Sequence, residues 1–233
     1  MHLFHCPDLS TDMVQLPEEE AHHAASVLRL TAGTMIGLLN GKGQRAEASI
    51  VEITKRGVLA NIHARMQQAA ERQARIHLAV APTKQMDRYE WFVEKAVEIG
   101  VDRITPLLTD RTERSRLRID RLERVAISAM KQSQRSWLPK IDEPTMLKDL
   151  LNEELPRQRF FGWCEGQHAP MMTVYAASEH AVLLIGPEGD FTSDEAEILR
   201  KQGFRAVALG EARLRTETAA LAACTWMSLA QQR

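Results

Sequence analysis

Two short segments near the end of the chain combine glycines with charged and hydroxyl side chains, a pattern suited to ligand binding. Residues 186–189 read Gly-Pro-Glu-Gly, and residues 209–219 begin with Leu-Gly and end with Leu-Arg-Thr-Glu-Thr-Ala. Each segment follows an apolar, strand-like run, at residues 181–185 and 205–209. Ligands of α/β proteins bind just past the carboxyl ends of parallel strands, where glycines allow a close backbone approach. We therefore expect the two segments to lie side by side and to offer backbone N–H and C=O groups to a flat polar heterocycle.

Other kinds of active site have little support in the sequence. The dinucleotide fingerprint Gly-x-Gly-x-x-Gly and the nucleophile motif Gly-x-Ser-x-Gly are both absent. The histidines His2, His5, His22 and His23 lack cysteine or carboxylate partners at the spacings typical of metal ligands, so we predict no metal site.

The composition indicates an ordinary globular protein. Of the 233 residues, 44% are hydrophobic and 26% are charged, and the apolar runs are too short to span a bilayer. The first ten residues lack the basic and apolar regions of a secretory signal. The three cysteines, Cys6, Cys164 and Cys224, lie far apart with no Cys-x-x-Cys pair, which favours reduced thiols in a cytoplasmic protein.

Charge is distributed unevenly along the chain. The total is −1, but residues 103–140 hold ten basic and four acidic side chains, a net charge of +6. Residues 141–233 hold nine basic and fourteen acidic side chains, a net charge of −5. The basic block is either a phosphate-binding face or a solvated helix surface, and charge alone does not decide between the two.

The first 68 residues are typical of a small β-barrel. Short alternating runs at residues 34–39, 46–53 and 57–62 are separated by turn residues, and the Asn-Gly pair at 40–41 is a strong hairpin signal. Residues 22–30 have helical spacing, and the polar residues 64–75 lack an apolar stripe and are predicted to be a linker.

From Ile76 onward, strand-like and helix-like segments alternate, which predicts an α/β fold with a mainly parallel sheet. Thr192–Glu195 fits a capping box that opens a helix, and Gly100 and Gly203 follow predicted helix ends. The predicted strands cover 76–80, 101–108, 160–164, 181–185 and 205–209, and the longer predicted helices cover 86–99, 119–132 and 216–231.

Taken together, the motifs resemble those of the 16S ribosomal RNA (uridine-N3) methyltransferases, the RsmE family of the SPOUT superfamily. The resemblance covers most of the chain, and its last two motifs are specific as a pair. The matching residues are His22-His23 with Val27-Leu28-Arg29; Lys84, Arg88, Glu94-Lys95 and Glu98–Val101; Ile104–Pro106; Arg111 with Ser115; Gln132–Arg135 with Pro139; Ile185–Gly189; and Leu209-Gly210 with Leu214–Ala219.

The resemblance implies an N-terminal PUA-like β-barrel over residues 1–70, which helps to bind RNA, and a SPOUT methyltransferase domain with a trefoil knot over residues 71–233. It also implies a homodimer that uses S-adenosyl-L-methionine and acts on 16S rRNA of the small ribosomal subunit, with no membrane or metal partner. The cofactor-binding residues that it implies are Cys164, Glu165, Ile185, Gly186, Glu188, Gly189, Leu209, Gly210, Leu214, Arg215 and Thr216.

Uridine N3 carries a proton and becomes nucleophilic only when that proton leaves, so catalysis needs a proton acceptor or cations that stabilise the developing anion. Our hypothesis places Arg215 and Arg135 near the target uridine as catalytic residues. The alternative for Arg215 is a structural salt bridge with Glu217 or Glu188. Glu188 and Glu217 are candidate proton acceptors, but capping of the helices that follow them is favoured, which leaves the proton acceptor unassigned. The residues expected to bind RNA are Arg29, Lys84, Arg88, Arg111, Arg114 and Arg116.

The chain departs from the family pattern at two positions. Asp190 stands where a glycine is common, and the arginine after Gly210 comes one residue later than in many members, at Arg213. These departures leave open which loop arginine contacts the RNA or the cofactor. Three rival functions remain: methylation of another base or of a ribose 2′-hydroxyl, RNA binding without catalysis in ribosome assembly, and a metabolic α/β enzyme.

Overall fold

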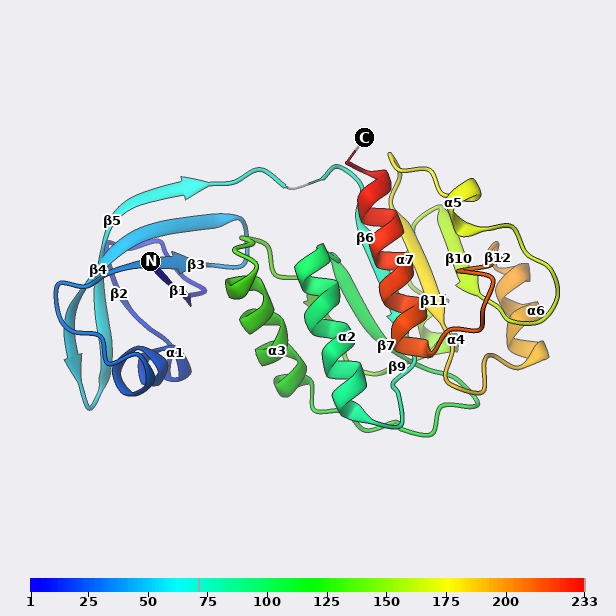
Figure 1. Ribbon diagram of the computed structural model, residues 1–233, viewed down its shortest axis with the longest axis horizontal. Coiled ribbons are helices and arrows are strands. Elements are labelled where there is room, and N and C mark those ends of the chain that lie inside the picture. The colour runs from blue at the N-terminus through cyan, green and yellow to red at the C-terminus, as the bar shows by residue number, and fades with distance from the viewer. Residues whose placement is uncertain (71, 233) are drawn as a thin grey trace. The chain divides into compact units, whose positions relative to one another are not determined.

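The computed structural model describes residues 1–70 and 72–232, which form two compact units. The N-terminal unit comprises Met1–Glu71 together with Ile127–Leu138, and the C-terminal unit comprises Arg72–Ala126 together with Pro139–Arg233 (Figure 1). No helix in the described part of the chain is long and apolar enough to cross a membrane.

The N-terminal unit is built on one five-stranded sheet in the order β1-β3-β4-β5-β2. All its strand pairs are antiparallel except β1 with β3. Its core contains Phe4, Ile36, Leu38, Ile50 and Val58, all nearly inaccessible to solvent. The strands are β1 (His2–His5), β2 (Met13–Gln15), β3 (Met35–Leu39), β4 (Gln44–Thr54) and β5 (Gly57–Gln67).

Both predicted hairpins of this unit are confirmed. Gly41 and Gly43 adopt positive φ angles of 71° and 86° between β3 and β4, the conformation that favours glycine. Two other predictions are corrected. Strand β5 continues to Gln67, because residues 64–67 pair with β4, so the linker is shorter than the polar composition suggested. The helix predicted at 22–30 instead begins earlier, as α1 (Glu18–His22) followed by the π-helical turn η1 (His23–Val27).

Residues 127–138 pack with the N-terminal sheet, which the sequence did not predict. Ser136 Oγ donates to Gln68 Oε1 at 2.6 Å, and the Leu138 amide donates to the Gly41 carbonyl at 2.9 Å. A Cβ on Gly43 would lie only 2.4 Å from the Trp137 ring, so glycine permits the indole to pack on the hairpin.

The C-terminal unit is built on a parallel sheet in the order β12-β10-β11-β6-β7-β8, with β9 also pairing with β7. Strand β11 lies between β6 and β10. Because every pair is parallel, the carboxyl ends of β10, β11 and β12 meet at one edge. The strands are β6 (Ile76–Val80), β7 (Arg103–Leu108), β8 (Lys140–Ile141), β9 (Thr145–Met146), β10 (Gln158–Gly162), β11 (Ala181–Ile185) and β12 (Arg205–Val207).

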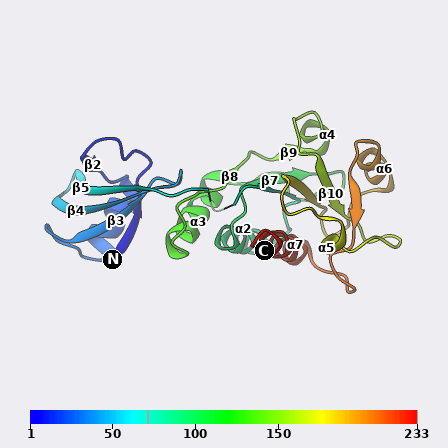
Figure 2. The same ribbon diagram turned by 90° about the horizontal axis from the view of Figure 1, so that it is seen from above.

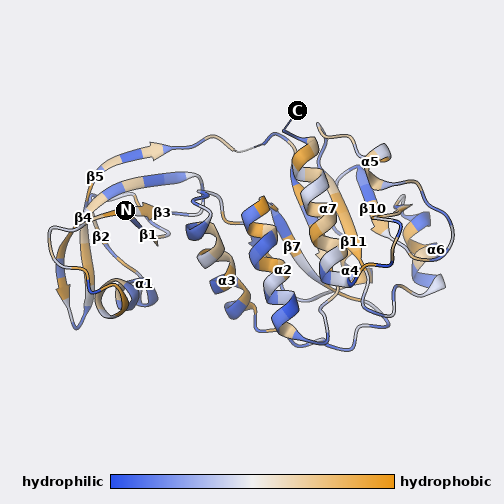
Figure 3. Cartoon of the chain, in the orientation of Figure 1, coloured by the Kyte–Doolittle hydropathy of each residue, from blue (hydrophilic) through white to orange (hydrophobic). Residues whose placement is uncertain are grey.

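Helices cover both faces of this sheet, with α2 and α7 on one face and α4 and α6 on the other (Figure 2). In Figure 3, strand β11 and much of α7 are hydrophobic, whereas α2 alternates between hydrophilic and hydrophobic positions. The helices are α2 (Met86–Ile99), α3 (Ile119–Gln132), α4 (Leu147–Leu150), α5 (Met171–Val174), α6 (Ser193–Lys201) and α7 (Thr216–Ala230).

The local signals that predicted helix ends are confirmed. Gly100 adopts a φ of 103° as the left-handed cap of α2. The Thr192 side chain accepts from the Glu195 amide at 3.1 Å, and the Glu195 carboxylate accepts from the Thr192 amide at 2.8 Å. This reciprocal capping box fixes where the chain enters α6 after β11.

Candidate functional site

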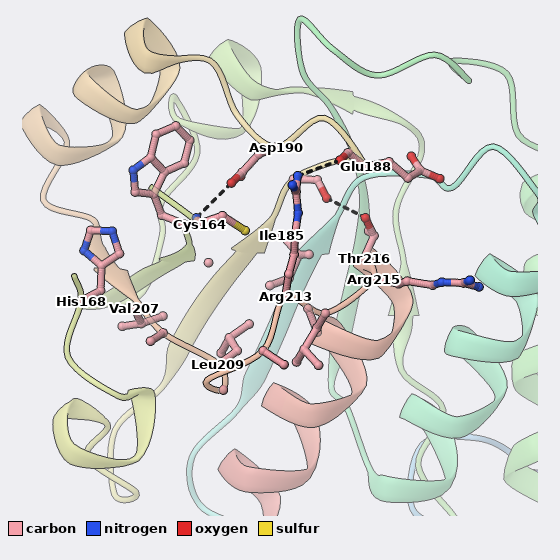
Figure 4. Close-up of a pocket in the computed structure, with 18 of the residues that line it drawn as sticks. Cys164, His168, Ile185, Glu188, Asp190, Val207, Leu209, Arg213, Arg215 and Thr216 are labelled. Atoms are coloured by element: carbon pink, nitrogen blue, oxygen red, sulfur yellow. Dashed lines mark hydrogen bonds between the residues drawn. The ribbon is translucent and has the colours of Figure 1, made fainter. Parts of the chain in front are cut away.

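A cavity of about 610 Å³ lies at the carboxyl edge of the C-terminal sheet. Its walls come from the ends of β10, β11 and β12, from the loops that follow them and from the first turn of α7 (Figure 4). We call these the β10 loop (residues 163–170), the β11 loop (186–192) and the β12 loop (208–215). The predicted convergence of the two glycine-bearing segments is therefore confirmed, and a third loop joins them.

A hydrogen bond joins α7 to the β11 loop. Thr216 Oγ1, at the first position of the helix, donates to the Gly186 carbonyl at 3.1 Å (Figure 4). Thr216 is buried, so this bond closes the cavity wall between two segments that are distant in the sequence. The Thr-Glu-Thr motif thus begins α7 and also anchors it to the β11 loop.

Different features of the structure explain the two glycines, Gly186 and Gly210, that follow the strand-like runs. A Cβ on Gly186 would lie 3.1 Å from the Phe191 amide nitrogen and 3.2 Å from the Asp190 carbonyl carbon. Glycine there lets the β11 loop fold on itself. A Cβ on Gly210 would meet no atom closer than 4.0 Å, so the protein itself does not fill that space. Of the two, Gly210 leaves room beside a ligand.

Asp190 links the β11 loop to the β10 loop. Its Oδ2 accepts from the Cys164 amide at 3.0 Å (Figure 4), and its Oδ1 accepts from the Phe191 amide at 2.8 Å. Burial raises the pKa of the Cys164 thiol, and the Asp190 carboxylate raises it further. The thiol therefore stays protonated near neutral pH, which argues against a nucleophilic thiolate.

Glu188 does not cap the helix that follows it, contrary to the sequence-based expectation. Its Oε1 accepts from the Lys84 amide at 3.1 Å and so ties the β11 loop to the segment before α2. Thr192 and Glu195 cap α6 instead. Glu217 lies in the first turn of α7 and is buried, the expected place for a carboxylate at a helix N-terminus.

The three arginines of residues 111–116 that were predicted to bind phosphate fall into two groups. Arg111 Nη1 donates to the carbonyls of Gly189 at 2.6 Å and Phe191 at 3.1 Å, and Arg114 donates to the Lys84 carbonyl at 3.0 and 3.2 Å. Arg116 is exposed, and its guanidinium has no hydrogen bond or ion pair within the described residues. Two of the predicted phosphate ligands are thus engaged with backbone carbonyls.

The two predicted catalytic arginines belong to different units. Arg215 lies in the C-terminal unit, and Arg135 lies in the segment assigned to the N-terminal unit. The Arg215 guanidinium is exposed and pairs with no described residue, so the alternative salt bridge with Glu217 or Glu188 is absent. Figure 4 shows its side chain pointing away from the other labelled side chains.

Nine of the eleven predicted cofactor-binding residues line the cavity: Cys164, Ile185, Gly186, Glu188, Leu209, Gly210, Leu214, Arg215 and Thr216. Glu165 and Gly189 do not. The Glu165 carbonyl accepts from His168 Nε2 at 2.6 Å, and the place of a Cβ on Gly189 lies 3.3 Å from Arg111 Cδ.

The remaining predicted RNA ligands lie outside the cavity lining. Lys84 pairs with Glu113 at 2.7 Å, which raises the pKa of the Lys84 ammonium group, and Arg88 is in the first turn of α2. Arg29 is exposed in the N-terminal unit with a φ of 52°.

Sequence reasoning missed several cavity residues, among them Trp163, His168 and Asp190. Asp190 was visible as a departure from a common glycine, whereas Trp163 and His168 match no motif in the sequence. Within the residues that the structure describes, no three His, Cys, Asp or Glu side chains are placed to hold a metal ion.

Two family descriptions match the chain. The RNA methyltransferase domain matches residues 70–228, and the RNA methyltransferase PUA domain matches residues 16–62. The first of these covers more than half of the chain and includes every segment that lines the cavity.

The relatives among solved structures and those among curated proteins carry matching descriptions. A probable rRNA-methyltransferase from Porphyromonas gingivalis is 36% identical, with a TM-score of 0.91 over 100% of this chain and 99% of its own. The ribosomal RNA small subunit methyltransferase E from Neisseria gonorrhoeae, bound to S-adenosyl methionine, is 28% identical, with a TM-score of 0.87 over 98% and 97% of the two chains. The protein of the same name from Buchnera aphidicola is 28% identical over 90% of this chain and 85% of its own.

Proposed function

The chain belongs to the RsmE family of RNA methyltransferases, and we propose that it transfers the methyl group of S-adenosyl-L-methionine to N3 of one uridine in 16S rRNA of the small ribosomal subunit. The cavity at the carboxyl ends of β10, β11 and β12 carries this proposal. It is lined by the motifs shared with the family, and the relative from Neisseria gonorrhoeae binds S-adenosyl methionine.

The residues of the cavity fit such a cofactor. Its volume of about 610 Å³ is in the range of small-molecule sites. Ile185, Val207 and Leu209 offer apolar surface to a purine ring. The carboxylate of Glu188 suits the cationic sulfonium and ammonium groups of the cofactor, and Arg213 suits its carboxylate. The open space beside Gly210 leaves room for close approach.

When bound, S-adenosyl-L-methionine supplies an activated methyl group, so the protein's task is to position the base and to stabilise the anion that forms when N3 loses its proton. Arg215 suits the second role, because its guanidinium is exposed, unpaired within the described residues and adjacent to the cavity. The target uridine must be unpaired or flipped out to expose N3. Arg135 stays a proposed second catalytic residue, supplied by the segment 127–138.

RNA binding is proposed for basic side chains of both units. Arg116 is available for phosphate, and Lys84, Arg88, Arg114 and Arg29 complete the proposed set. Phosphate contacts release counterions, so RNA affinity should fall as salt rises, with a slope that decreases by about one for each arginine removed. An RNA affinity that is independent of salt would contradict this part of the proposal.

The proposal includes three further expectations from the family. The chain forms a homodimer, it acts in the cytoplasm, and its C-terminal sheet contains a trefoil knot. What supports the knot is the return of the chain after the edge strand β12: the helix that follows, α7, packs on β6, β11 and α2 (Figure 1). Mass measurement in solution tests the dimer.

Nucleoside analysis tests the central reaction. Small ribosomal subunits from cells that lack this protein are incubated with purified protein and methyl-labelled S-adenosyl-L-methionine, and the RNA is digested for mass spectrometry. We expect N3-methyluridine at one position. A ribose-methylated nucleoside would show a related methyltransferase of different specificity, and cofactor binding without methylation would favour an assembly factor.

A further inference from the structure

The strongest unexplained feature of the site is the way Asp190 is held. Its φ of 62° lies in the left-handed region, which side-chain-bearing residues seldom occupy. Its carboxylate nevertheless reaches out of its own loop to the Cys164 amide at 3.0 Å (Figure 4). Asp190 therefore links the β10 loop to the β11 loop, whose backbones pair with each other only within the preceding strands.

Arg111 fixes the backbone on both sides of Asp190. One guanidinium nitrogen, Nη1, donates to the carbonyls of Gly189 and Phe191, the two residues that flank Asp190. Gly189 permits this contact, because a Cβ there would lie 3.3 Å from Arg111 Cδ and 3.7 Å from Arg111 Cβ. The second glycine of the Gly-Pro-Glu-Gly motif is thus explained by the arginine that packs on it.

We propose that Arg111 and Asp190 act together as positioning residues for the cofactor, with Arg111 clamping the β11 loop and Asp190 tying that loop to the β10 loop. Arg111 is then primarily a support of the cofactor site, in contrast to the phosphate-binding role that the basic block suggested. The inference rests on the proposed cofactor. Cys164 and Asp190 both line the cavity, so loosening their link changes the shape of the cofactor site directly.

Calorimetric titration with S-adenosyl-L-methionine, in the absence of RNA, tests the proposal. We expect Arg111→Ala and Asp190→Gly each to weaken cofactor binding about tenfold, the net scale of losing a hydrogen bond to a charged group. Glycine suits the left-handed backbone at 190, so Asp190→Gly is expected to remain folded. Because both residues act on one loop, the double substitution should weaken cofactor binding by no more than about the larger of the two single substitutions does.

Two further variants distinguish a positioning role of Asp190 and Arg111 from a direct effect of their charges. Asp190→Asn keeps an oxygen acceptor for the Cys164 amide and tolerates a positive φ, so it should bind the cofactor within about threefold of the wild type. Arg116→Ala removes an exposed arginine that contacts neither loop and should leave cofactor affinity unchanged. In steady-state methylation, the Arg111 and Asp190→Gly variants should raise KM for the cofactor more than they lower kcat.

The opposite pattern would overturn the proposal. If Arg111→Ala and Asp190→Gly bind the cofactor as the wild type does, and Arg111→Ala loses only RNA affinity, then Arg111 is a phosphate ligand. If Arg111→Ala does not fold, Arg111→Lys and Asp190→Gly decide the question in the same titration. A wild-type protein that binds no S-adenosyl-L-methionine would instead contradict the proposed function, which distinguishes the two failures.

Discussion

The polar side chains at the two ends of the C-terminal sheet differ in their hydrogen bonding. Near the amino ends of β6 and β7, and just after the two-residue strand β8, His77 Nε2 and Thr105 Oγ1 lie 2.7 Å apart, and Thr105 donates to Asp142 at 2.5 Å. Asp142 also accepts from Arg103 at 2.6 Å and pairs with Lys140 at 2.8 Å. At the carboxyl edge, the cavity is lined by charged residues, of which Arg215 makes no side-chain bond within the described residues.

This difference separates a structural cluster from a binding site. Burial, and then the positive charge of Arg103, lower the pKa of His77 to about 3, so the imidazole is neutral at physiological pH. Burial alone would raise the pKa of Asp142, but hydrogen bonds from Lys140, Thr105 and Arg103 lower it overall. The strongly lowered pKa of His77 therefore belongs to a structural cluster and not to the candidate site.

The largest expected effect is at the amino-end cluster. Asp142→Ala removes the shared acceptor of Arg103, Thr105 and Lys140 and leaves the buried Thr105 hydroxyl without its acceptor. We expect the free energy of unfolding, measured in urea, to fall by about 3 kcal/mol. Glu197→Ala, which breaks an exposed pair with Lys201, is the matched control and should change stability by less than about 0.5 kcal/mol. If both substitutions lowered the free energy of unfolding equally, the amino-end cluster would contribute no more to stability than an exposed ion pair does.

At the carboxyl edge, Arg215→Ala should act on catalysis and leave stability unchanged. We expect kcat/KM for methylation of small subunits to fall about a hundredfold, the scale of losing one donor to a developing anion. Arg157→Ala, an exposed arginine just before β10, should have no effect. Methylation by Arg215→Ala at the wild-type rate would exclude Arg215 from the reaction.

The pH dependence of stability should report the buried His77. Its pKa is lower in the folded protein than in the unfolded chain, so the unfolded chain binds more protons as the pH falls. Between pH 7.5 and 5.5, this group alone should reduce the free energy of unfolding by about 1.4 kcal/mol. His77→Asn should flatten the measured profile in that range. An unchanged profile would mean that the pKa of His77 is the same in the folded protein and in the unfolded chain.

Substitution of Gly186 should affect stability, whereas substitution of Gly210 should affect cofactor binding. Gly186→Ala places a methyl group 3.1 Å from the Phe191 amide nitrogen and should lower the free energy of unfolding by about 1 kcal/mol. Gly210→Ala meets no close atom and should change stability by less than about 0.5 kcal/mol, while it narrows the cavity and weakens cofactor binding a few-fold. Thermal unfolding and calorimetry measure the two effects, and the reverse assignment would contradict the geometry.

Local signals in the sequence predicted local structure well. The capping box at Thr192, the left-handed cap at Gly100 and the hairpin at Gly41 depend on neighbouring residues, and all three are confirmed. The predicted strand at 205–209 ends already at Val207, because strand ends depend on pairing partners that a single segment does not reveal.

Long-range features were harder to predict. The position of β11 between β6 and β10 depends on partners about 20 to 105 residues away, and no periodicity encodes that choice. The packing of residues 127–138 with the N-terminal unit and the contacts of Arg111 with the β11 loop are of the same kind. A block of positive charge predicts a basic surface, but not which arginines bind their own backbone.

Amide hydrogen exchange, with and without S-adenosyl-L-methionine, tests the contrast between the two ends of the sheet most directly. We predict that the cofactor slows exchange in the β10, β11 and β12 loops and leaves the segments around His77 and Asp142 unchanged. Protection confined to the amino ends of the strands, or absent from all three loops, would contradict the assignment of the carboxyl edge as the cofactor site.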